Sequence, residues 1–126
     1  MTHFDDKTIL DHERLLRRIH PEQWIYDGKL GRRRPTSAAF QDVELSVDLA
    51  TSFEQRGVPV TQPLIGHPGF LLSSVTAGTM RANAQAVVRD PLPDNTAHAL
   101  VVGKKTQRIQ RNLAISALWI VPPIEA

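Results

Sequence analysis

The chain has 126 residues, of which 41% are hydrophobic and 22% are charged, the size and balance of one globular domain. It contains no cysteine, which excludes disulfide frameworks, thiolate nucleophiles, zinc ribbons and iron–sulfur clusters. Fifteen Lys and Arg residues against 13 Asp and Glu give a net charge of +2, so composition alone does not indicate nucleic-acid binding. No secretory signal and no apolar run of about 20 residues is visible, so we expect a cytoplasmic protein without membrane contact.

The first predicted element is a helix from Asp6 to Ile19. Ile9, Leu16 and Ile19 recur at helical spacing, and Pro21 disfavours the helical conformation at the residue before it. Residues 22–39 show no sustained period and contain turn residues, which predicts a long loop or a short hairpin anchored by aromatic side chains.

Four later segments predict strands of a mainly antiparallel sheet. The first alternates strictly between apolar and polar residues, and the last two flank a turn, Asp90 to Asn95, that favours a hairpin. A turn-rich surface loop from Gly57 to Gly69 precedes the second, and Thr76 to Ala82 predicts a short helix after it. The four segments are Val43 to Leu49, Phe70 to Val75, Ala84 to Arg89 and Ala97 to Val102.

The strongest helical pattern covers Thr106 to Leu118, because Ile109, Leu113 and Ala117 recur at intervals of four. The sequence therefore predicts a single α+β domain over residues 1–126, with a sheet of about four strands packed by the N- and C-terminal helices. The predicted core consists of Ile9, Leu16, Ile19, Leu45, Val47, Val87, Leu100, Val102, Ile109, Leu113 and Trp119.

No known catalytic or cofactor motif survives a test of spacing. Gly103 and Lys104 lack the second glycine that a phosphate-binding loop needs, since position 98 is His. The histidines show no metal-ligand spacing, and no serine lies in a Gly-x-Ser-x-Gly pattern. Glu44 and Asp48 stand about 13 Å apart on one strand face, too far for a glycosidase pair. We expect neither a metal nor a cofactor.

Two basic clusters suggest instead a contact with a macromolecule. Trp24 lies near the first cluster in the sequence and would supply an apolar anchor. We therefore expect an accessory or interaction protein with a protein partner, or alternatively with nucleic acid, and the sequence does not indicate an oligomeric state. The clusters are Arg32, Arg33 and Arg34, and Lys104, Lys105, Arg108 and Arg111.

The alternative is an enzyme or ligand-binding domain with a polar site from separated segments. This hypothesis is favoured if the side chains of Arg34, Ser37, Ser46 and His98 meet in one concave pocket, and it is disfavoured if they scatter over the surface. The candidate residues are Arg18, Arg34, Ser37, Glu44, Ser46 and His98.

Four segments in this order resemble a group of small uncharacterised bacterial proteins: Leu15 to Ile19 (LLRRI), Arg34 to Phe40 (RPTSAAF), Glu44 to Asp48 (ELSVD) and Ala97 to Gly103 (AHALVVG). The resemblance covers most of the chain and implies no particular activity. A weaker similarity to the ADP-ribosyltransferase superfamily lacks the late glutamate of those enzymes, because only Glu125 follows Glu54.

Overall fold

Two successive leucines, Leu15 and Leu16, are both buried and belong to hydrophobic clusters on opposite faces of a sheet. Successive side chains of a strand point to opposite faces, so a strand with both neighbours buried lies inside a sheet that is covered on both sides. In the computed structural model, which describes residues 4–124, this strand is β1 (Arg14–Ile19).

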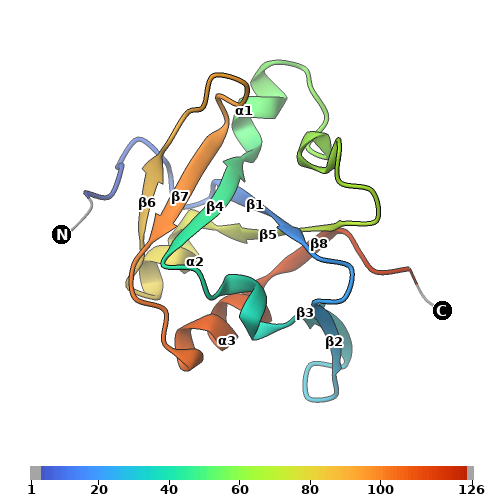
Figure 1. The fold of residues 1–126 in the computed structure, drawn as a ribbon. Helices are drawn as coiled ribbons and strands as arrows, with labels where there is room; N and C mark the ends of the chain where they lie inside the picture. Colours follow the sequence, from blue (N-terminus) through green and yellow to red (C-terminus); the bar gives the residue numbers. More distant parts are fainter. Residues whose placement is uncertain (1–3, 125–126) are drawn as a thin grey trace.

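The main sheet has six strands in the order β6-β7-β4-β1-β5-β8, and every neighbouring pair is antiparallel (Figure 1). A separate antiparallel hairpin of β2 (Trp24–Asp27) and β3 (Arg32–Pro35) lies beside it. The remaining strands are β4 (Glu44–Leu49), β5 (Leu71–Thr76), β6 (Ala86–Arg89), β7 (His98–Val102) and β8 (Leu118–Val121).

The α+β class and the antiparallel sheet are confirmed, but the predicted N-terminal helix is wrong. Its last residues form β1, between β4 and β5. The helical spacing of Ile9, Leu16 and Ile19 was coincidental, because Leu16 and Ile19 serve opposite faces of the sheet. Burial of adjacent leucines on two faces is typical of an interior strand rather than of an amphipathic helix.

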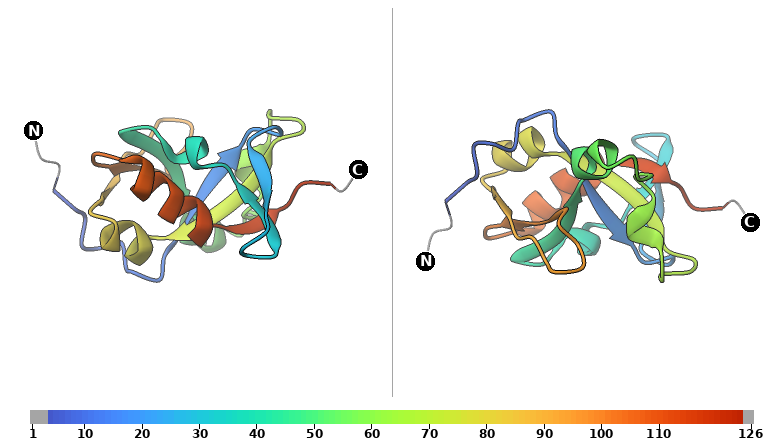
Figure 2. Two further views of the ribbon diagram at one scale, coloured as in Figure 1. Left: turned by 90° about the horizontal axis from the view of Figure 1, so that it is seen from below. Right: turned by 90° about the horizontal axis from the view of Figure 1, so that it is seen from above.

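Both faces of the sheet are covered, as the two views in Figure 2 show. One face packs on the largest hydrophobic cluster, which includes Phe40, Met80 and Leu113. The elements that supply these residues are η1 (Ser37–Phe40), α2 (Ala77–Ala82) and α3 (Gln107–Ser116). The other face packs on a smaller cluster around Phe53, formed by α1 (Ala50–Gln55) and by the segment containing η2 (Gln62–Leu64).

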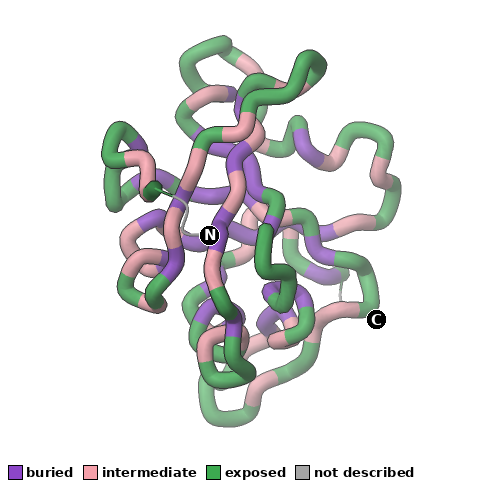
Figure 3. The backbone as a smooth tube through the Cα atoms, turned by 60° about the vertical axis from the view of Figure 1, so that its left-hand side comes forward, coloured by how far each residue is buried: buried purple, intermediate pink, exposed green. Residues whose placement is uncertain are grey.

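The four predicted strands are all present, and the sheet gains β1 and β8. The helix at Thr106 to Leu118 ends at Ser116, because Ala117 is extended and the chain returns to the sheet as β8. The predicted core residues are buried except three, Leu100, Ile109 and Trp119, which are partly exposed. Figure 3 shows the buried segments inside the domain and the exposed ones mainly along its loops and turns.

The sheet consists of two three-stranded halves, β6-β7-β4 and β1-β5-β8, whose strands run in clearly different directions in Figure 1. The halves are joined where β1 pairs with β4 at only two positions, Leu15 with Leu49 and Leu16 with Asp48. Beyond Leu16 the side chain of Arg17 replaces the backbone pairing between the strands, because it donates hydrogen bonds to the carbonyl oxygens of Ser46 (3.1 Å) and Ala39 (3.2 Å).

Arg17 is therefore a half-buried charge used as a structural bridge. Burial lowers the pKa of its guanidinium, and the carboxylate of Asp42 at 3.6 Å acts in the opposite direction. A hydrogen bond that satisfies a buried carbonyl group is more costly to remove than it is favourable to form.

We expect Arg17→Met to lower the free energy of unfolding by about 1–3 kcal/mol, because the carbonyls of Ser46 and Ala39 lose their charged donor. Urea denaturation monitored by circular dichroism measures the change. Arg14→Met, at the exposed start of the same strand, is the matched control and should change stability by less than about 0.5 kcal/mol. Equal stability of the two variants would contradict the role of Arg17 as a bridge.

Candidate functional site

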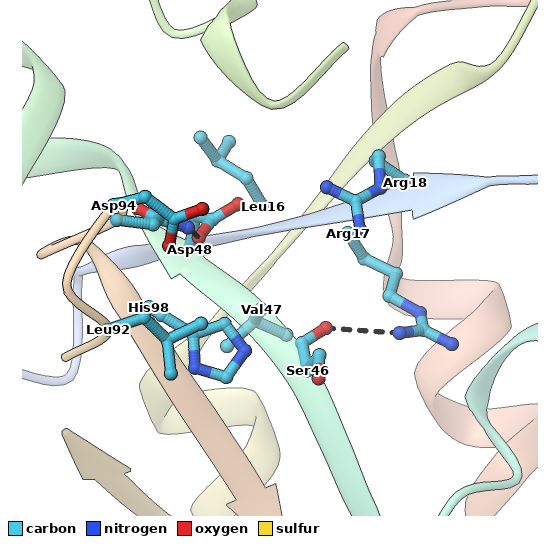
Figure 4. Close-up of a pocket in the computed structure, with 10 residues that line it drawn as sticks. Leu16, Arg17, Arg18, Ser46, Val47, Asp48, Leu92, Asp94 and His98 are labelled. Atoms are coloured by element: carbon cyan, nitrogen blue, oxygen red, sulfur yellow. Dashed lines mark hydrogen bonds between the residues drawn. The ribbon is translucent and has the colours of Figure 1, made fainter. Parts of the chain in front are cut away.

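A polar cleft lies over the sheet where its two halves diverge. It has two connected parts, of about 230 Å³ and about 350 Å³, which share Arg18, Asp48, Asp94 and Asn95. We call the first the inner lobe; Figure 4 shows it. The second, the outer lobe, extends toward α1 and η2. The inner lobe is also lined by Leu16, Arg17, Ser46, Val47, Leu92 and His98, and the outer lobe by Phe53, Arg56, Gln62, Pro63, Ile65 and His67.

Strand register brings the inner-lobe residues together. Asp48 stands opposite His98 in the β4–β7 pair and opposite Leu16 in the β1–β4 pair. Paired residues of neighbouring strands share a face, so these three side chains form one row across β7, β4 and β1. Ser46 lies two residues before Asp48 in β4, and Arg18 lies two residues after Leu16 in β1. Side chains two residues apart on a strand share a face, so Ser46 and Arg18 are on the same face as this row.

His98 is oriented by Asp90, at the start of the loop between β6 and β7. Its Nδ1 lies 3.0 Å from the carbonyl oxygen of Asp90 and 3.0 Å from Oδ2 of the same residue. A carbonyl oxygen can only accept, so Nδ1 carries a hydrogen and, in the neutral ring, Nε2 keeps its lone pair. No residue within 4–124 donates to Nε2.

The carboxylate of Asp48 is buried at the border of the two lobes. Nδ2 of Asn95 donates to its Oδ1 at 2.7 Å, which offsets part of the cost of removing a carboxylate from water. Oδ1 of Asn95 in turn accepts from the backbone N–H of Ala97 at 3.2 Å. The backbones of Asn95 and Leu92 exchange two hydrogen bonds of 3.0 Å, so the β6–β7 loop is a tight turn held over the cleft.

The six candidate residues from the sequence do not meet in one pocket. Arg18, Ser46 and His98 line the inner lobe. Ser37 lines a different hollow between η1 and α3, and Glu44 is exposed at the start of β4. Arg34 is buried away from the cleft.

Arg34 serves the β2–β3 hairpin. Its Nε donates to Oδ2 of Asp27 at 2.7 Å, and its Nη1 donates to the carbonyl oxygen of Pro35 at 2.8 Å. The hydrogen bond from Arg34 is the main cause that holds the pKa of the Asp27 carboxyl below its usual value. This arginine therefore stabilises the hairpin and does not line the cleft.

Sequence reasoning missed Asp48, Asp90 and Asn95. Asp48 belongs to a strand in which polar and apolar residues alternate, a pattern typical of a solvated polar face, whereas the β6–β7 loop covers this position. Asp90 and Asn95 lie at the two ends of the predicted turn, and only the turn composition was visible. The sequence offered one indication of these site residues, which is that His98 opens a strand shortly after this acidic turn.

The first basic cluster is occupied by internal contacts. Arg32 donates to the carbonyl oxygens of Ile115 (2.7 Å) and Ala117 (3.4 Å), satisfying groups at the end of α3. Arg33 donates to the carbonyl oxygen of Pro123 at 3.2 Å, and its guanidinium lies over the ring of Trp24. Arg32 and Arg33 therefore attach the hairpin to the C-terminal segment, whereas the buried Arg34 stabilises the hairpin itself.

The second cluster divides into one buried and three exposed side chains. Nζ of Lys105 donates to the carbonyl oxygens of Val43 (3.1 Å), Val101 (2.9 Å) and Gly103 (3.3 Å). Lys104, Arg108 and Arg111 are exposed and form no ion pair with a carboxylate in residues 4–124.

Comparison with known proteins identifies no relative: no protein-family model, no curated protein and no solved structure matches the chain. The similarity to a bacterial group, the bacterial origin and the cytoplasmic location stay predictions. No helix between residues 4 and 124 is long and apolar enough to cross a membrane. Within the same residues no group of three or more His, Asp or Glu side chains could hold a metal ion.

Burial lowers the pKa of Lys105 to about 8, from an ordinary value of 10.5. Between these two pH values the unfolded chain holds a proton that the folded chain has released, so the free energy of unfolding rises with pH. We expect a gain of up to about 3 kcal/mol for the wild type, measured by urea denaturation at several pH values. The gain should vanish in Lys105→Met and persist in Lys104→Met, and an unchanged rise in Lys105→Met would contradict this assignment.

Proposed function

We propose that this chain is an enzyme for a small polar molecule, with His98 as its general base. The observation that carries the proposal is the contact of His98 Nδ1 with the carbonyl oxygen and with Oδ2 of Asp90, which leaves Nε2 as an acceptor in a polar cleft. A base held in one tautomer by a carboxylate is the arrangement that general-base catalysis needs. The six-residue site expected from the sequence is not formed, but three of its residues, Arg18, Ser46 and His98, line one polar cleft, and this smaller site favours an enzyme over a passive adaptor.

The proton movements follow from these contacts. Nε2 takes a proton from a hydroxyl group of the substrate or from water, and the resulting imidazolium is stabilised by the carboxylate of Asp90 at 3.0 Å. The deprotonated oxygen forms a bond to an electrophilic atom of the substrate, the bond between that atom and the leaving group breaks, and Nε2 returns the proton to the leaving group. The amide of Asn95, the carboxylate of Asp48 and the hydroxyl of Ser46 supply donors and acceptors for the hydroxyl groups of a ligand.

Ser46 is not assigned as a nucleophile. Its hydroxyl lines the inner lobe but makes no hydrogen bond with His98 or any other described residue. A serine nucleophile and its base are recognised by a direct hydrogen bond. Attack by water or by a second hydroxyl of the substrate therefore fits the geometry better than a covalent intermediate on Ser46.

Binding of an acidic macromolecule is a second proposal, favoured by the exposed face of α3. Arg108 and Arg111 line a hollow of about 550 Å³ between η1 and α3, together with Ser37, Ala38 and three glutamines. Lys104, Arg108 and Arg111 have no internal carboxylate partners among the described residues, so their charge is available to a partner. Such a contact would weaken as salt concentration rises.

The tautomer of His98 tests the first premise of the proposed function. Long-range ¹H–¹⁵N correlation spectra of the uniformly labelled protein, with His98→Gln to assign the signal, should show the hydrogen of the neutral ring on Nδ1. The exposed His20 is the internal control, since it has no carboxylate partner. A neutral ring protonated on Nε2 would show that His98 cannot act as the proposed base.

Conversion of a bound ligand tests whether His98 acts as a general base. Hydroxylated small molecules are screened for binding by saturation-transfer NMR, and each ligand that shifts cleft resonances is followed for conversion. We expect His98→Gln to lower the rate constant of conversion by about 10²- to 10⁴-fold with little change in ligand affinity. His20→Gln should retain the full rate. Conversion at the wild-type rate by His98→Gln would exclude this residue as the base.

A further inference from the structure

The outer lobe contains two arginines whose charges have no partner within the described chain. Arg18 comes from β1 and Arg56 from the residue after α1, and neither forms an ion pair with a carboxylate among residues 4–124. Other arginines do form such pairs: Arg14, Arg17, Arg34, Arg81 and Arg89. Two unneutralised guanidinium groups in one hollow favour an anionic ligand.

Both groups are held by contacts that leave donors free. Nε of Arg56 donates to the carbonyl oxygen of Ser52 at 3.1 Å, and its guanidinium lies over the ring of Phe53 at 5.3 Å. Its two terminal nitrogens have no hydrogen bond to the residues of the structure. Nη1 of Arg18 donates to the carbonyl oxygen of Pro63 at 3.3 Å. Both side chains are exposed, and each is restrained by these contacts, which reduces the ordering entropy that is lost when an anion binds.

The remaining lining residues point to phosphate as the anion. His67, whose ring meets the edge of Phe70, and the amide of Gln62 add donors beside the arginines. A phosphate monoester has three terminal oxygens and up to two negative charges, so it uses more donors than a carboxylate can.

The carboxylates of the cleft determine where such a group would sit. Asp48 and Asp94 line both lobes, whereas Arg56 and His67 line the outer lobe alone. Repulsion by the two aspartates keeps an anion at the outer end, next to Arg56 and His67. The inner lobe, with His98, is then left to an uncharged part of the same molecule.

We propose that the outer lobe binds the phosphate group of a phosphorylated, hydroxylated small molecule, whose uncharged part extends to His98. This inference rests on the proposed function for the role of His98, but phosphate binding itself does not depend on it. In a regular sheet, two strand spacings and two residues would separate the Cα atoms of Arg18 and His98 by roughly 12 Å, and the divergence of β1 from β4 beyond Leu16 increases this separation. Arg18 and His98 both line the inner lobe, so their side chains border one cavity that a sugar phosphate can bridge.

Isothermal titration calorimetry with inorganic phosphate, ribose 5-phosphate and ribose tests the subsite. The wild type should bind ribose 5-phosphate at least about ten-fold more tightly than ribose, and Arg18→Met and Arg56→Met should each raise the Kd of inorganic phosphate at least about ten-fold. Methionine keeps an apolar chain against Phe53 and removes the charge. Arg14→Met, on the same strand outside the cleft, should bind phosphate as the wild type does.

The outcomes separate the two proposals. His98→Gln should leave the Kd of inorganic phosphate unchanged, so loss of turnover with intact phosphate binding supports both. Wild-type phosphate affinity in Arg18→Met and Arg56→Met, or equal affinity for ribose and ribose 5-phosphate, would overturn the phosphate subsite without affecting the tautomer of His98. Thermal unfolding of each variant verifies that a loss of binding does not reflect a loss of folded protein.

Discussion

The early divergence of β1 from β4 is the constraint on which the site depends. Had the two strands stayed paired beyond Leu16, Ser46 would have had a backbone partner where the structure has the guanidinium of Arg17. The divergence opens the inner lobe and turns the two halves of the sheet relative to each other (Figure 1). The guanidinium of Arg17 thus gives the carbonyl oxygen of Ser46 the hydrogen bond that a regular ladder would have supplied. The space between the diverging strands is left open and forms the inner lobe.

The residues of the cleft show how a small antiparallel sheet can build a site with few specialised features. Neighbouring strands place Asp48, His98 and Arg18 on one face, and loops add the groups that fix their orientation. The β6–β7 loop has both tasks at once, since Asp90 orients the imidazole and Asn95 satisfies the buried carboxylate of Asp48. The contacts that stabilise the loop therefore also hold the side chains of the site in place.

Local patterns in the sequence predicted much of this architecture. The alternation before Leu49 and the four-residue spacing around Leu113 gave a strand and a helix that the structure confirms. The central strand was missed because Leu15 and Leu16 are buried by different clusters on the two faces of the sheet. The segments that form these clusters are distant in the sequence, so no local pattern indicates them. The same limit applies to the site: Asp48 meets Asn95, and Arg32 meets the end of α3, across long stretches of chain. Long-range pairing decides whether such a polar group is solvated, structural or functional.

The order of the strands has a consequence for the nascent chain. Among the described strands of the main sheet β1 is the first to be synthesised, yet its partners β4 and β5 come much later. Until both have emerged, its two leucines and its two open edges are exposed to other unfolded chains. Such non-local pairing slows folding and lengthens exposure to aggregation. The adjacent arginines, Arg17 and Arg18, place positive charge beside this apolar segment, and charges in that position oppose the association of exposed strands, so the residues that shape the cleft have a second physical effect before the sheet is complete.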